Sequence, residues 1–144
     1  MISGEQFVRG LANAVPEVFA GIDLAEEYGY AAYSAADEDA WARTIALADA
    51  VKWMEAEALV VSRREESTAV RRPDLLRRFF AYVEEVLVAQ SDDSDRGWIM
   101  VELFEGIPWV EDVIDFLGPQ TTALLREAQD VLARYNGWIG TWRA

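Results

Sequence analysis

The chain has 144 residues, of which 52% are hydrophobic, a formal net charge of -13, and neither cysteine nor histidine. This length and hydrophobic share suffice for one domain with a real core, and they exclude a disordered acidic tail. The missing cysteines exclude disulfides and thiolate metal sites. The missing histidines exclude the usual general base at neutral pH and the commonest ligand of zinc, copper and non-haem iron.

Negative charge is concentrated in the two outer parts of the sequence. Residues 1–60 carry eleven acids against three bases, and residues 91–144 carry ten acids against four bases. Residues 61–90 hold six arginines against five acids and form a weakly basic island. Nucleic acid is not an expected partner, because phosphate binding is driven by cationic surface. An acidic surface serves solubility, or it attracts a basic protein.

The start of the chain, MISGEQFVRG, has Glu5 where a signal peptide would have its basic and apolar segments. No apolar run approaches the roughly 18 to 20 residues that cross a membrane. We therefore expect a cytoplasmic protein that does not span or bind a membrane.

Apolar residues recur at helical spacing through the first half of the chain. Ser3 and Gln6 form a capping-box pattern ahead of a first helix. Pro16 is suited to the first position of a second helix, which Gly29 would end. Asp37 is a good N-cap for a long third helix. The apolar stripe of this third helix consists of Leu47, Val51, Met54, Ala58 and Val61, widened by Trp41, Ile45 and Trp53.

Prolines mark helix starts in the second half. Pro73 is expected to open a fourth helix and Pro119 a final one. Between them, two short helices are expected over residues 97–105 and 108–117, joined by a hinge. No segment alternates with the two-residue period of a strand. The sequence thus predicts an all-α fold without a sheet: a single domain over residues 1–144 with six to seven helices, arranged as a bundle or as stacked helical hairpins.

One stretch, SDDSDRGWIMVELFEGIPWVEDVIDF, holds eight carboxylates but only one base, Arg96. An EF-hand loop that started at Asp92 would have Arg96 at its fifth position and Leu103 at its twelfth, where oxygen ligands are required. A calcium loop is therefore not expected.

Magnesium is the stronger metal hypothesis. Glu102 and Glu105 lie three residues apart, as do Asp112 and Asp115, so each pair would share a helix face. Such paired motifs resemble those of all-α nucleoside triphosphate pyrophosphohydrolases of the MazG type, which use Mg²⁺. The stretch departs from that family because the doubled glutamate before Glu102 is missing, the gap between the pairs is short, and no basic cluster lies nearby for a triphosphate. We expect no catalytic residue, no metal and no cofactor.

The preferred interpretation is an acidic face that binds a basic protein partner, with Trp109 either as an anchor residue or as a half-buried core residue. The predicted face comprises Asp92, Asp93, Asp95, Glu102, Glu105, Trp109, Glu111, Asp112 and Asp115. A self-associating structural protein, for example a homodimer, is the remaining alternative.

The segments LLRRFFAYVEEVL, IMVELFEGI and LLREAQDVL, with the acidic loop after the first, resemble a group of small all-α bacterial proteins of unknown function. Members of that group are suspected to be immunity proteins of polymorphic toxin systems. The resemblance implies a protein without catalytic activity that binds a basic toxin domain and blocks its active site.

Overall fold

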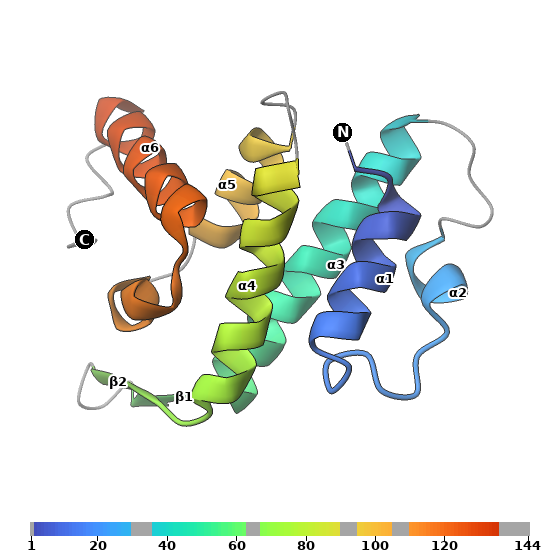
Figure 1. Cartoon of the computed structure of the whole chain (residues 1–144), viewed down its shortest axis with the longest axis horizontal. Helices are drawn as coiled ribbons and strands as arrows, with labels where there is room; N and C mark the ends of the chain where they lie inside the picture. Colours follow the sequence, from blue (N-terminus) through green and yellow to red (C-terminus); the bar gives the residue numbers. More distant parts are fainter. Residues whose placement is uncertain (1, 30–35, 63–66, 90–94, 105–109, 136–144) are drawn as a thin grey trace.

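The computed structural model describes residues 2–29, 36–62, 67–89, 95–104 and 110–135 (Figure 1). Its helices are α1 (Gly4–Ala14), α2 (Leu24–Tyr28), α3 (Ala36–Glu57), α4 (Pro73–Ala89), α5 (Arg96–Phe104) and α6 (Pro119–Tyr135), and a 3-10 helix, η1, covers Val110–Phe116. Two short strands, β1 (Leu59–Ser62) and β2 (Ser67–Val70), complete the described elements. The helices pack against one another, which confirms the all-α prediction.

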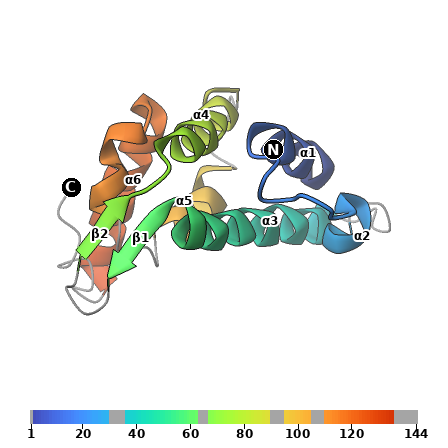
Figure 2. The same cartoon turned by 90° about the horizontal axis from the view of Figure 1, so that it is seen from below.

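The long helix α3 lies along one side of the molecule and contacts α1, α2 and α5, while α4 contacts α1, α6 and η1 (Figure 2). The buried side chains form one cluster that includes Phe7, Leu47, Phe79, Phe104 and Leu125. This shared core is what fixes the position of η1 relative to α4.

Several helix boundaries agree with the signals in the sequence. The Ser3 side chain accepts a hydrogen bond from the Gln6 N–H at 3.1 Å, and the Gln6 side-chain oxygen accepts one from the Ser3 N–H at 3.4 Å, so the capping box is confirmed. Gly29 ends α2 with a φ of 68°, a left-handed conformation that glycine adopts without a steric penalty. Pro73 and Pro119 are the first residues of α4 and α6, as predicted.

The prediction of a fold without a sheet is wrong in one place. β1 and β2 form an antiparallel pair in which Leu59 is opposite Val70 and Ser62 is opposite Ser67. The sequence Leu59-Val60-Val61 continues the apolar stripe of α3, so the helical pattern alone extends that helix to Val61. Its β-branched residues favour a strand once a partner strand is within reach. The third helix therefore ends at Glu57 instead of reaching Val61.

Three further expectations are corrected by the structure. The second helix begins at Leu24 rather than at Pro16, because Asp23 accepts a hydrogen bond from the Glu26 N–H and acts as the N-cap. Trp41 does not widen a buried stripe, since it is 55% exposed. The segment expected as a helix over residues 108–117 forms a 3-10 helix in its described part.

Two polar contacts tie the N-terminal helices to the rest of the core. Arg78 on α4 donates hydrogen bonds to both carboxylate oxygens of Glu17 and to the carbonyl of Ala14, the last residue of α1. The Tyr28 hydroxyl at the end of α2 donates to Asp49 on α3 at 3.0 Å. Burial and this neighbouring carboxylate raise the pKa of Tyr28 above its ordinary value, so the hydroxyl stays a donor.

Candidate functional site

The 3-10 helix η1 presents two carboxylates in line. Val113 on η1 is buried against the core, whereas Asp112 and Asp115 are exposed. A 3-10 helix has three residues per turn, so side chains at positions i and i+3 are eclipsed along its axis. At about 2 Å of rise per residue, the backbone positions of Asp112 and Asp115 are about 6 Å apart along that axis. The two acids therefore form a short row on one edge of η1.

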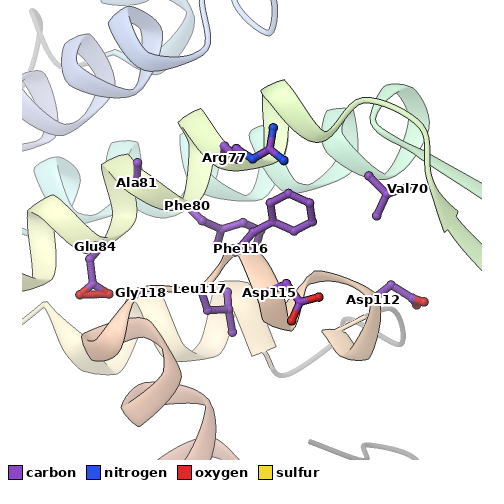
Figure 3. Close-up of a pocket in the computed structure, with 10 residues that line it drawn as sticks. All are labelled: Val70, Arg77, Phe80, Ala81, Glu84, Asp112, Asp115, Phe116, Leu117 and Gly118. Carbon is purple, nitrogen blue, oxygen red and sulfur yellow. The ribbon is translucent and has the colours of Figure 1, made fainter.

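An open groove lies between this edge and α4, with a volume of about 720 Å³ (Figure 3). In this view Glu84 and Gly118 lie at one end of the groove and Val70 and Asp112 at the other. The lining residues come from β2, α4, η1 and the turn before α6: Val70, Arg77, Phe80, Ala81, Glu84, Asp112, Asp115, Phe116, Leu117 and Gly118. The described lining thus combines apolar side chains with three carboxylates and one cation.

Arg77 is the one cation among the described residues that line the groove. Its guanidinium lies over the Phe116 ring, 5.7 Å from the ring centroid, which is within the range of a cation–π contact. This contact joins the α4 wall of the groove to the η1 wall.

Glu84 closes one end of the groove and stabilises α6. Its carboxylate accepts hydrogen bonds from the Gln120 N–H at 2.8 Å, the Thr121 N–H at 2.8 Å and the Thr121 hydroxyl at 3.0 Å. The first N–H groups of a helix have no partners within the helix, and an anion is favourable at this end. Glu84 therefore caps α6 from α4, and Asp112 and Asp115 are the exposed carboxylates in the described lining of the groove.

Asp95, one of the predicted site residues, does not lie on the surface. It is fully buried, and its carboxylate accepts hydrogen bonds from the Ile2 N–H at 3.0 Å and from the Trp98 indole N–H at 2.9 Å. The inclusion of Asp95 in an exposed face is therefore corrected: its contacts give it a structural role at the start of the chain.

Arg43 completes this arrangement from α3. It is 3% exposed, donates to the Ile2 carbonyl at 2.8 Å, and lies over the Trp98 ring at 5.6 Å from the centroid. Both polar backbone groups of Ile2 are thus bonded to buried charged side chains. The segment before α1 is held against α3 and α5 by these contacts.

The structure places the remaining predicted residues in three groups. Asp92, Asp93, Glu105 and Trp109 lie outside the described residues. Glu111 is part of η1, and only its backbone is described. Glu102 lies on α5 and is half-buried, not fully turned to water as expected. Of the nine predicted residues, the structure therefore brings Asp112 and Asp115 together at one exposed edge.

The four-carboxylate magnesium arrangement includes Glu105 and so extends beyond the described part of the chain. Within that described part, no group of three or more acidic residues is placed to hold a metal ion. The same residues contain no helix that is long and apolar enough to cross a membrane.

The sequence did not point to the groove residues on the other walls. Arg77 belongs to the weakly basic island of residues 61–90, and Leu117 was expected on the apolar side of the helix over residues 108–117. The three-residue spacing of Val110, Val113 and Phe116 is a signal that could have indicated a 3-10 helix and the alignment of Asp112 with Asp115.

Comparison of the chain with protein-family models, with curated proteins and with solved structures gave no significant match.

Proposed function

We propose that this protein is a non-catalytic acidic binding protein that associates with a basic protein, and that the partner is a bacterial toxin which it neutralises. The observation that carries the proposal is the exposed pair Asp112 and Asp115 beside an open, partly apolar groove. The chain's net charge of -13 supports it. The toxin class follows from the resemblance of the chain to suspected immunity proteins.

Negative surface charge affects association with a partner more than it affects the stability of the fold. Isolated exposed charges contribute little to stability, but a surface of one sign attracts a partner of the other and disfavours wrong partners. Among the described residues, no hydrogen bond or ion pair engages the Asp115 carboxylate. Its charge is therefore available to a partner at no cost to the fold.

The test is co-expression of this chain with the product of the neighbouring gene in its source bacterium. The unmodified chain should suppress the toxicity of that product and co-purify with it. The double variant Asp112→Asn/Asp115→Asn should lose much of this protection while keeping its circular dichroism spectrum. The control Glu26→Gln/Glu27→Gln removes the same charge from exposed positions on α2, away from η1 in Figure 1, and should protect fully.

A second measurement separates a binding protein from a Mg²⁺-dependent hydrolase. Ligands that bind the folded state raise the melting temperature by mass action. We expect millimolar Mg²⁺ or Mn²⁺ to leave the melting temperature unchanged and nucleoside triphosphates to remain intact. A saturable stabilisation by metal that Glu102→Gln abolishes would contradict the proposal and support the enzyme.

A further inference from the structure

We propose that the groove between η1 and α4 receives an extended basic segment of the partner, in which two cationic side chains two residues apart pair with Asp112 and Asp115. This inference rests on the proposed function and specifies how the partner is recognised. It follows from the spacing of the carboxylates, the apolar lining of the groove and the position of Arg77.

The spacing of the two carboxylates suits an extended chain. Their positions on η1 repeat at about 6 Å. In an extended strand, residues i and i+2 point to the same side and are about 6.6 Å apart. Lysine or arginine at alternate positions would therefore face Asp112 and Asp115 in register, whereas adjacent basic residues would point to opposite sides.

The lining of the groove suits long basic side chains. Val70 and Phe116 are partly exposed, and Phe80 forms buried apolar surface beneath them. Lysine and arginine bury their aliphatic stems on such surface while the charged end reaches a carboxylate. A volume of about 720 Å³ is within the range of sites that hold a molecule of drug size, which corresponds to a few side chains.

Arg77 gives the groove a polarity across its width. The acids Asp112 and Asp115 lie on the η1 wall, and the guanidinium of Arg77 comes from the α4 wall (Figure 3). A basic segment in the groove is attracted by Asp112 and Asp115 and repelled by Arg77. Removal of the Arg77 charge should therefore strengthen binding, while removal of either aspartate charge should weaken it.

The experiment uses the full chain and two labelled peptides of the same composition, measured by fluorescence anisotropy at low ionic strength. In one peptide lysine alternates with threonine, and in the other the lysines are adjacent. The alternating peptide should bind at least about threefold tighter. Chemical shift changes should centre on Asp115 and Phe116.

The variants test each wall of the groove. Asp112→Asn and Asp115→Asn should each weaken binding of the alternating peptide by about two- to fivefold, and Arg77→Gln should strengthen it by about twofold. Glu26→Gln should change nothing. General damage to the fold would weaken binding in all groove variants, so the opposite sign at Arg77 identifies a direct electrostatic effect.

Three results would overturn the inference. The first is equal binding of the two peptides. The second is weaker binding by Arg77→Gln together with the aspartate variants. The third is a dimer in sizing experiments that Asp115→Arg dissociates, because a second copy of the chain would then occupy the groove.

Further outcomes separate this inference from the proposed function. If the neighbouring toxin is neutralised by the double variant Asp112→Asn/Asp115→Asn as well as by the unmodified chain, the groove assignment fails while a toxin-binding function stands. If the peptides bind as described but no basic partner protein is neutralised, the proposed function fails and the groove assignment stands.

Discussion

The carboxylate of Glu84 on α4 accepts two hydrogen bonds from Thr121 on α6, one from its backbone N–H at 2.8 Å and one from its hydroxyl at 3.0 Å. Thr121 is fully buried, so its polar groups depend on this partner. This contact sets the angle between α4 and α6 and closes one end of the groove. It is a cap supplied by a residue 37 positions away in the sequence.

Replacement of Glu84 by alanine should lower the free energy of unfolding by about 2 kcal/mol, because buried donors at the start of α6 lose their acceptor. Glu85→Ala, at the next and exposed position, should change it by less than about 0.5 kcal/mol. Urea denaturation measures the unfolding free energy of both variants.

Gly118 lies against the Glu84 side chain. A β-carbon at Gly118 would collide with that side chain, so Gly118→Ala should also destabilise the protein, and it should do so by less in the Glu84→Ala background. Additive effects would contradict a shared contact.

The Glu17–Arg78 contact should make stability depend on acid pH. Hydrogen bonds from Arg78 lower the pKa of Glu17 from 4.5 to about 2. A lowered pKa in the folded state stabilises the protein above pH 4.5, and this stabilisation is lost as the pH falls towards 2. Because both side chains are partly exposed, the contribution at pH 7 should be about 1 kcal/mol.

Glu17→Gln should therefore be less stable than the unmodified chain at pH 7, and the two unfolding free energies should converge as the pH is lowered towards 2. Thermal denaturation across this range checks the prediction. The control is Glu5→Gln, which removes an exposed carboxylate that pairs with Arg9 within α1 and should matter little. A difference that stays constant with pH would show that ionisation of Glu17 does not contribute.

The close approach of α1 to α4 requires a glycine at position 10. A β-carbon there would overlap the Tyr82 ring, whose hydroxyl donates to the Phe7 carbonyl at 2.9 Å. Gly10→Ala should destabilise the protein by about 1–3 kcal/mol despite the better helix propensity of alanine. A β-carbon at Gly97 on α5 would meet no atom within 4 Å. Gly97→Ala should therefore leave the free energy of unfolding unchanged or raise it by up to about 1 kcal/mol. If both glycines respond alike in chemical denaturation, the helix crossing is looser than described.

Asp95→Asn should act on stability and not on partner binding. Both carboxylate oxygens of Asp95 accept N–H groups in the core, and an amide can replace only one of them. The expected loss is about 2 kcal/mol in the free energy of unfolding. Asp115→Asn, an isosteric change at an exposed position, should leave stability within about 0.5 kcal/mol. If Asp95→Asn left the stability unchanged and weakened binding of a basic partner, Asp95 would belong to the binding face after all.

The helices were predictable because their signals are local. Ser3 with Gln6, Gly29, Pro73 and Pro119 each act within one turn of the chain, and the periodic apolar residues between them identify the buried faces. The hairpin was not predictable in this way. Leu59-Val60-Val61 fits the end of a helix as well as a strand, and the choice depends on pairing with Ser67–Val70.

The candidate site was predictable only in part. Asp112 and Asp115 were identified because carboxylates three residues apart share a face in an α-helix and even more closely in a 3-10 helix. No local pattern distinguishes the buried Asp95 from its acidic neighbours, since its hydrogen bond to Ile2 spans 93 positions. The groove likewise depends on α4 and β2 meeting η1, and such non-local contacts leave no periodic trace in the sequence.

The most direct test is the salt dependence of association between this chain and the product of the neighbouring gene, which we propose as its basic partner, measured by stopped-flow fluorescence. The rate of an association that is steered by charge falls steeply as ionic strength rises, because charges farther apart than a Debye length of about 10 Å at 0.1 M salt are screened from each other. We expect the association rate to fall steeply with salt for the unmodified chain and for Glu26→Gln/Glu27→Gln. For Asp112→Asn/Asp115→Asn we expect a lower association rate that depends less on salt. Identical rates and identical salt slopes for all three proteins would contradict it, and would leave the acidic edge of η1 as ordinary solvated surface.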